Sequence, residues 1–288
     1  MSFSMAPSRG LSTGVALCLV SILCIQLGSA LSAGLIREIG PATAAFLRFS
    51  VAAVVLALVV RPRFLAFDRR QWTAAVGLGI AMAGMTFCFF SAIERIPLGL
   101  AVAIDFLGPL AVAAFGLGGW RLVWPAAAFI GVLFLSHDGT GWVGEPLGML
   151  FAAGAGTGWA AYIILMKRSS VLFEGLDGLA ASLLVAALAS APFGILSARS
   201  GLSVDMFGAI VGIAFLVPLL PYAMELTALR RMPVVAFGIL MSLEPAAASL
   251  VGAAMLDQPL ALLQIVGTAL VVVASVGVTL SGRQGDAA

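Results

Sequence analysis

The chain reads Ala92-Ile93-Glu94-Arg95-Ile96-Pro97 and, 136 residues later, Ala228-Leu229-Arg230-Arg231-Met232-Pro233. Twelve residues past each final proline stands another proline, Pro109 in the first copy and Pro245 in the second, within an apolar run. Two more pairs keep the same register, Ala111 with Ala247 and Gly116 with Gly252. A half that recurs within a strongly apolar chain is typical of carriers that open alternately to the two sides of a membrane.

The composition is that of an integral membrane protein. Of the 288 residues, 62% are hydrophobic and only 10% are charged, and the mean hydropathy is +1.14. A soluble domain needs more charge to cover its surface, and each helical crossing of a bilayer needs about 20 apolar residues. Ten charge-poor runs are predicted as spans, at residues 12–33, 41–60, 72–93, 97–117, 122–136, 147–166, 176–196, 205–225, 233–255 and 260–281.

Several classes of function find no support in the sequence. The connections between the runs are too short to hold a soluble domain. Cys18, Cys24 and Cys88 all fall within predicted spans and the lone His137 has no Cys partner, so we expect neither a disulfide nor a metal site. A net charge of +2 gives no indication of nucleic-acid binding. The sequence carries no signal for a cofactor or for an oligomeric state.

The basic residues indicate how the chain is oriented. With the N-terminus inside, alternate connections place eleven Lys and Arg residues on the inner side, namely Arg9, Arg61, Arg63, Arg69, Arg70, Arg121, Lys167, Arg168, Arg230, Arg231 and Arg283. The outer side carries three, Arg37, Arg95 and Arg199. Because connections rich in Lys and Arg stay in the cytoplasm, we expect both termini there.

Each half contains five predicted spans, which is an odd number. The second half, residues 137–288, must therefore enter the membrane from the face opposite to the first half, residues 1–136. The repeated stretch agrees, because Glu94-Arg95 falls outside and its equivalent, Arg230-Arg231, falls inside, where a second arginine replaces the carboxylate. We expect an all-α membrane protein with ten transmembrane helices arranged as an inverted five-plus-five repeat.

Asp105 lies near the middle of the fourth predicted span. A central carboxylate costs roughly 2.5 to 3.5 kcal/mol on insertion scales, so we expect its side chain to face a cavity or a partner. Pro109 has no N–H, and we expect it to break the helix and free the backbone carbonyl of Asp105. A carboxylate and an unpaired carbonyl at one level are suited to bind a proton or an ammonium group.

The second half carries a related acid at a different position. Pro245 on the ninth predicted span frees the carbonyl of Met241, the repeat equivalent of Asp105. The acid is Glu244, directly before this proline. Asp105 and Glu244 either bind substrate and protons or pair with other groups to fix the bundle, and acids inside a membrane favour the first role. Glu225, near the cytoplasmic end of the eighth span, is expected to be solvated.

Three further side chains complete the predicted site. Arg48 is the only basic residue well inside a predicted span. Its guanidinium is suited to bind a substrate carboxylate, to pair with an acid, or to reach along apolar surface to an interface. Gln26 on the first span and Tyr162 on the sixth add hydrogen-bonding groups to a central cavity. Trp159, also on the sixth span, is expected to pack rather than to line the pathway.

The stretch from Arg95 to Val112, RIPLGLAVAIDFLGPLAV, resembles the EamA branch of the drug/metabolite transporter superfamily. Within that branch it is most similar to the threonine/homoserine exporters of the bacterial inner membrane. Supporting matches are Gly158 to Ile164 followed by Lys167-Arg168, and Ser242 to Ala246. The number and order of spans agree along nearly the whole chain.

The resemblance implies ten helices in an inverted repeat, a central cavity, and export of a small amino acid driven by the proton gradient, with no bound cofactor. It also implies an acid at Asp105, where these exporters usually carry Glu. The shorter side chain withdraws the carboxylate by one methylene group, which leaves the substrate open. Glu244-Pro245 matches the broader superfamily, so this pair indicates the fold more than the substrate.

Other functions fit the sequence less well than amino-acid export. An exporter of cationic or lipophilic drugs, or of other small metabolites, would place the two acids against a cation. A membrane-embedded enzyme would need a cluster of polar catalytic groups near an interface, which a single His and short connections do not provide. We expect the partners to be the lipid bilayer and a small molecule, with no nucleic acid.

Overall fold

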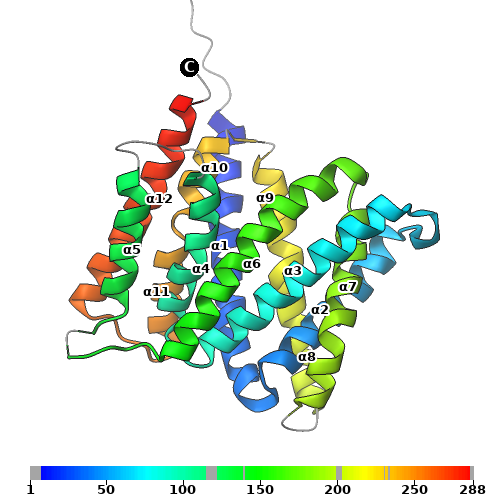
Figure 1. Cartoon of the computed structure of the whole chain (residues 1–288), viewed down its shortest axis with the longest axis horizontal. Coiled ribbons are helices and arrows are strands. Elements are labelled where there is room, and N and C mark those ends of the chain that lie inside the picture. Colours follow the sequence, from blue (N-terminus) through cyan, green and yellow to red (C-terminus); the bar gives the residue numbers. More distant parts are fainter. Residues whose placement is uncertain are drawn as a thin grey trace, which may run out of the picture.

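Figure 1 shows the computed structural model of the chain, which describes residues 8–114, 122–138, 140–198, 203–229, 231–232 and 234–285. The first half contains α1 (Ser8–Ile39), α2 (Pro41–Val60), the short η1 (Phe64–Ala66), α3 (Arg69–Ile93), α4 (Leu98–Ala114) and α5 (Val123–Leu135). The second half contains α6 (Pro146–Leu172), α7 (Asp177–Leu196), α8 (Val204–Ala214), the π-helical turn η3 (Phe215–Leu219), α9 (Leu220–Leu229), α10 (Val234–Met241), α11 (Glu244–Met255) and α12 (Leu262–Gly285).

Among the described residues, seven helical stretches are long and apolar enough to cross a membrane. Three shorter apolar helices complete the set, at Leu98–Val112, Val123–Leu135 and Val204–Val217. The stretch Ala236–Met255 combines α10 and α11 in a single span. Each of these ten stretches overlaps one of the ten predicted spans, which confirms the predicted all-helical membrane fold.

The helices begin and end where local chemistry favours it. At the start of α3, Gln71 N donates to Asp68 Oδ1 at 2.7 Å and Asp68 N donates to Gln71 Oε1 at 2.9 Å, which is a capping box. Gly40 turns the chain from α1 into α2 within one residue, at a φ of 86° that side chains other than glycine rarely adopt. Pro41 follows in the first turn of α2, where its missing N–H removes no helical bond.

The repeated sequence forms the same turn twice. In the first half, Arg95 N and Ile96 N both donate to Ala92 O, at 2.8 and 2.9 Å. In the second half, Arg231 N and Met232 N donate to Ala228 O, at 2.8 and 3.0 Å. Figure 1 shows that the turn between α3 and α4 and the turn between α9 and α10 lie at opposite ends of the bundle. The two halves are therefore related by inversion.

Helix packing follows the same symmetry. The pairs α2 with α7, α4 with α11 and α5 with α12 each join equivalent helices of the two halves. Gly131 on α5 and Gly267 on α12, which are also 136 residues apart, meet reciprocally. A Cβ on Gly131 would lie 2.7 Å from Gly267 O, and a Cβ on Gly267 would lie 2.6 Å from Gly131 O. Such a reciprocal contact is the property of a twofold axis.

The two ends of the bundle differ in charge. The start of α1 and the end of α12 share one end, called here the terminal end, and α5 leads into α6 at the opposite or far end (Figure 1). Arg37 and Arg95 lie at the far end. The connection between α2 and α3 and the last turns of α6 lie toward the terminal end (Figure 1), and they carry Arg61, Arg63, Arg69, Arg70, Lys167 and Arg168. Residues Gly116, Arg121, Arg199, Arg230 and Pro233 of the sequence argument lie outside the described residues.

The second half contains the discontinuous helices. Val217 has non-helical φ and ψ of −149° and 119° inside η3, which interrupts the eighth span. The ninth span is interrupted between α10 and α11, and Pro245 stands in the first turn of α11, as predicted for a helix break. The structure differs from the prediction at Pro109, because α4 continues through this residue to Ala114. A transmembrane helix can continue past a proline when neighbouring helices pack against it.

Candidate functional site

A cavity of about 510 Å³ lies between the two halves. All five polar side chains predicted for the site line it, namely Gln26, Arg48, Asp105, Tyr162 and Glu244, together with Pro109. They come from five different helices: α1, α2, α4, α6 and α11. Pro245 is buried and does not line the cavity. The remaining wall is largely apolar and aromatic, which is the usual setting of a small-molecule site with few polar groups.

Arg48 is held in this wall by aromatic rings. Its guanidinium carbon lies 4.8 Å from the centre of the Phe90 ring and 5.7 Å from that of Phe49. One terminal nitrogen donates to Thr86 Oγ1 at 3.3 Å, and Nε has no hydrogen-bond partner among the described residues. No carboxylate of the described residues forms an ion pair with it. The guanidinium is therefore positioned and charged, with capacity left for an anionic group.

Asp105 projects from α4 with only 8% of its surface exposed. Its Oδ1 atom has no hydrogen-bond partner among the described residues. The backbone carbonyl behaves otherwise than expected, because it packs against α6 rather than facing the cavity. A Cβ on Gly156 would lie 2.8 Å from Asp105 O, and a Cβ on Gly108 would lie still closer to Gly156 O. Asp105 thus lines the cavity, while its backbone carbonyl packs against α6.

Glu244 occupies the first turn of α11 and is 4% exposed. The N-terminal end of a helix carries a partial positive charge, which favours an anion there. Beside it, Ser242 and Ser275 join the interruption between α10 and α11 to α12 through a hydroxyl pair 2.7 Å apart. An interrupted helix whose new N-terminus lies at mid-membrane is a recurrent way of building ion and substrate sites in transporters.

Two cavity residues were not predicted to be there. Glu225 lines the cavity and accepts a hydrogen bond from Ser21 Oγ at 2.6 Å, so its expected solvated position is wrong. Trp159 also lines the cavity, and its ring meets Phe106 edge-on at 5.9 Å. The repeat contains a signal for Glu225, because its equivalent 136 residues earlier is Phe89, which lines the cavity too.

The cavity extends toward the terminal end. Its lining includes Glu225 on α9, Phe237 on α10 and Thr279 on α12. The end of α9, the start of α10 and the end of α12 lie at the terminal end of the bundle (Figure 1). The cavity therefore lies on the terminal side of the hydrogen bonds that join the two halves at the far end.

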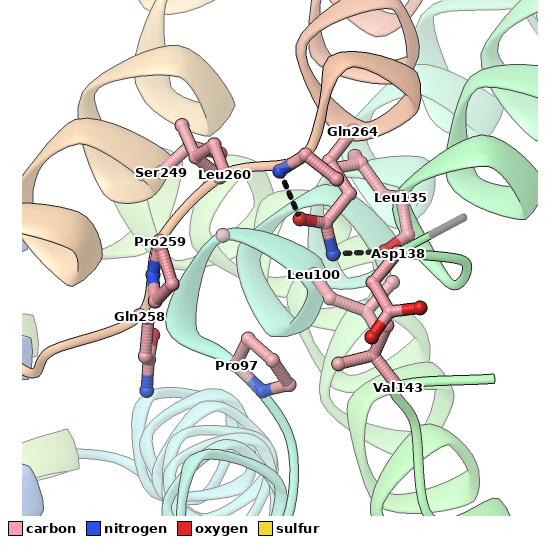
Figure 2. Close-up of a pocket in the computed structure, with 12 residues that line it drawn as sticks. Pro97, Leu100, Leu135, Asp138, Val143, Ser249, Gln258, Pro259, Leu260 and Gln264 are labelled. Atoms are coloured by element: carbon pink, nitrogen blue, oxygen red, sulfur yellow. Dashed lines mark hydrogen bonds between the residues drawn. The ribbon is translucent and has the colours of Figure 1, made fainter. Parts of the chain in front are cut away.

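At the far end the two halves are closed against each other. Leu98 N, at the start of α4, donates to Gln258 Oε1 at 3.0 Å. Figure 2 shows Gln264 Oε1 accepting from Ala261 N, at 3.0 Å, while Gln264 Nε2 donates to Leu135 O at 3.2 Å. These bonds tie the connection between α11 and α12 to α4 and α5, around a smaller pocket of about 460 Å³.

The far-end connection between α5 and α6 is ordered by its own hydrogen bonds. Asp138 Oδ1 accepts from Thr140 Oγ1, Thr140 N and Gly141 N at 2.7, 2.8 and 2.9 Å. These bonds hold the pKa of the Asp138 carboxyl below its usual range, with the Thr140 side chain as the largest cause. No group of three or more His, Cys, Asp or Glu side chains suited to a metal ion occurs in the described part of the chain.

Comparison with known proteins decides the family. A model of the EamA-like transporter family matches residues 146–280. The threonine/homoserine exporter RhtA of Escherichia coli (strain K12) is 34% identical over 274 residues, which cover 94% of this chain and 92% of that protein. Its counterpart in Salmonella typhimurium (strain LT2) is 33% identical over 270 residues, covering 92% of this chain and 91% of that protein. The chain belongs to the EamA-like transporter family.

This EamA-like chain also matches a crystal structure along nearly its whole length. The alignment covers 96% of this chain and 99% of the other, with a TM-score of 0.62 and 21% sequence identity. At that identity the likeness concerns the fold alone. Family membership makes the protein a membrane transporter, related to a threonine/homoserine exporter, and not an enzyme.

Proposed function

We propose that this EamA-like transporter exports small zwitterionic amino acids, of the threonine and homoserine kind, from the bacterial cytoplasm by proton antiport. Residues 1–136 and 137–288 form its two inverted repeats, in the inner membrane with both termini in the cytoplasm. In that orientation the cavity faces the cytoplasm, from which an exporter loads its substrate. The exporters among the relatives support this substrate class.

The unpaired guanidinium of Arg48 is the observation that carries the proposal. A charged side chain within a membrane span is costly when no counter-charge lies beside it, and it persists where a ligand supplies that counter-charge. Arg48 and Asp105 line one cavity, and neither forms an ion pair among the described residues. A zwitterion satisfies both, with its carboxylate on Arg48 and its ammonium group on Asp105.

Proton coupling follows from the acids of the same cavity. Asp105, Glu225 and Glu244 line about 510 Å³ of space in which several negative charges repel one another. Protonation therefore competes with binding of an ammonium group. In this cycle the transporter releases its substrate at the far end, an acid of the cavity takes up a proton there, and the protonated transporter returns. Substrate is thereby exchanged for a proton.

The first experiment is counterflow in proteoliposomes against a panel of amino acids, with and without a pH gradient. We expect uptake of labelled threonine or homoserine into preloaded vesicles, and net uphill flux only when a pH gradient is present. Absence of counterflow for every amino acid tested would remove the proposal. Gradient-independent uphill flux would remove the proton antiport alone.

Asp105→Asn tests the coupling directly. The change keeps the size of the side chain and removes its charge, so we expect gradient-driven export to be abolished while the protein still inserts and folds. Asp205→Asn, in the first turn of α8 outside the cavity, is the matched control. Unchanged proton-driven threonine flux in Asp105→Asn would contradict the assigned role.

A second candidate is export of cationic drugs or other small metabolites. It is favoured by the excess of acids, Asp105, Glu225 and Glu244, over the single cation Arg48 in a cavity whose wall includes aromatic side chains. Competition separates the two functions. In an amino-acid exporter, other amino acids should displace bound threonine. In a drug exporter, a quaternary ammonium ion such as tetraethylammonium should displace the bound ligand.

A further inference from the structure

Gln26 is a buried amide with no hydrogen bonds. Only 1% of its surface is exposed, it projects from α1 into the wall of the cavity, and it has no partner among the described residues for either Nε2 or Oε1. Buried side-chain amides are normally hydrogen-bonded, because leaving them unsatisfied destabilises the fold. A buried amide without hydrogen bonds that lines a cavity indicates a ligand that supplies those bonds.

The hydroxyl groups that line the cavity already have partners. Thr86 accepts from Arg48, Ser29 Oγ donates to Ile25 O, and Thr279 Oγ1 donates to Ser275 O. Ser275 pairs with Ser242, and Tyr162 also has an interaction of its own. Gln26 therefore has the greatest unused hydrogen-bonding capacity among the neutral side chains that line the cavity.

The chemistry of the amide points to a hydroxyl group. A glutamine side chain offers two N–H donors and a carbonyl acceptor, while a hydroxyl offers one donor and accepts in return. One group of each kind can therefore bond reciprocally. Arg48 and Asp105 provide the charges that a backbone carboxylate and ammonium require, so Gln26 on a third helix is left for the side chain of the substrate.

We propose that Gln26 is the specificity-determining residue that binds the side-chain hydroxyl of the amino acid, so that the transporter selects hydroxyl-bearing substrates over apolar ones of the same shape. The inference rests on the proposed function, because it assumes that Arg48 and Asp105 bind the zwitterion. A site built to hydrogen-bond a hydroxyl rejects an analogue without one, because the polar group of the site is then left unsatisfied.

The test compares threonine with valine, in which a methyl group replaces the hydroxyl. Binding of each is measured on the purified full-length transporter, and counterflow of each is measured in proteoliposomes. We expect the wild type to bind threonine roughly tenfold more tightly than valine or better. In Gln26→Leu the ratio falls to about one, because threonine binding weakens while valine binding is kept. The homoserine and norvaline pair should behave in the same way.

Two controls separate recognition from folding. Gln26→Leu removes an unsatisfied buried amide, so we expect its melting temperature to be equal to or above that of the wild type. Ser32→Ala removes another buried polar group of α1, one bonded to Gly28 O at 2.6 Å and absent from the cavity wall, and it should leave the threonine-to-valine ratio unchanged.

The possible outcomes distinguish this inference from the proposed function. Equal binding of threonine and valine by the wild type overturns the role of Gln26 and leaves amino-acid export standing. The same holds if Gln26→Leu keeps the wild-type preference. If no amino acid binds at all, both proposals fail together.

Discussion

The charged residues that line the cavity are not repeated between the two halves, although several uncharged lining residues are. Gln26 and Tyr162 are equivalent positions, as are Val102 and Gly238, and all four line the cavity. Each charged lining residue, by contrast, has an uncharged equivalent in the other half: Arg48 corresponds to Leu184, Asp105 to Met241, Glu225 to Phe89 and Glu244 to Gly108. The symmetric positions shape the cavity, and the asymmetric ones give it a polarity suited to a zwitterion.

Arg48→Met is expected to weaken amino-acid binding by roughly 10- to 150-fold, because a charge-assisted hydrogen bond to the substrate carboxylate is lost. Arg48→Lys should fall between Arg48→Met and the wild type, since an ammonium group keeps the charge without the bidentate geometry. Dissociation constants measured by thermal shift or calorimetry check both.

The control for Arg48 is Arg95→Met at the far end, where the guanidinium bonds Ser91 O and Glu94 rather than lining the cavity. Arg95→Met should leave binding unchanged. Arg48→Met should also unfold at the wild-type temperature or above, because an unpaired charge has been removed. Full binding by Arg48→Met would show that the substrate carboxylate is held elsewhere.

At the scale of elements, the two halves differ in the continuity of their cavity-lining helices. The interruptions at η3 and between α10 and α11 both belong to the second half, and Val217, Met241 and Glu244 at these points line the cavity. Their equivalents α3 and α4 are continuous helices. Interrupted helices bend more readily than continuous ones, so we infer that the second half moves against the first.

Gln258→Ala is expected to loosen the far-end closure, because the amide of Leu98 then loses its acceptor at the start of α4. The equilibrium should shift toward a state open at the far end. Reaction of Ser249→Cys, at the pocket of Figure 2, with a membrane-impermeant thiol reagent measures the shift. We expect faster labelling of Ser249→Cys when Gln258→Ala is present, and an unchanged rate would show that this bond does not hold the closure.

Gly131→Ala is expected to lower the free energy of unfolding by about 1–3 kcal/mol, since the added Cβ would lie 2.7 Å from Gly267 O in the α5–α12 contact. Gly84→Ala is the matched control, because a Cβ there meets nothing within 4 Å and α3 gains helix propensity. Thermal unfolding in detergent measures both. Equal melting temperatures for the two variants would contradict the close contact.

For the whole molecule, the charge difference between its ends predicts its orientation in the membrane. In a background with Cys18, Cys24 and Cys88 replaced by Ala, Thr140→Cys at the far end should react with an impermeant thiol reagent added to intact cells. Phe64→Cys, in η1 between α2 and α3, should react only after the cells are opened. The reverse pattern would place the termini outside and turn the cavity away from the cytoplasm.

The sequence by itself determined the membrane class, the ten spans and the inverted repeat, and it predicted five polar side chains that the structure places around one cavity. These depend on the length of apolar runs, on charge counts and on register, all of which are local properties of the chain. Placing Arg48, Asp105 and Glu244 in hydrocarbon costs free energy, so the sequence predicts a cavity or polar partners for them. It does not indicate where that cavity lies.

Only the tertiary structure decided which way each helix faces. It brought Gln26 and Arg48 to the cavity with unused hydrogen-bonding capacity, turned the Asp105 carbonyl against Gly156, and drew Glu225 inward to Ser21. Successive residues of an α-helix point about 100° apart, and in a membrane the rotation of a helix is set by contact with its neighbours rather than by its own apolar surface. The chain therefore specifies its buried charges, while the packing of the two halves determines what those charges meet.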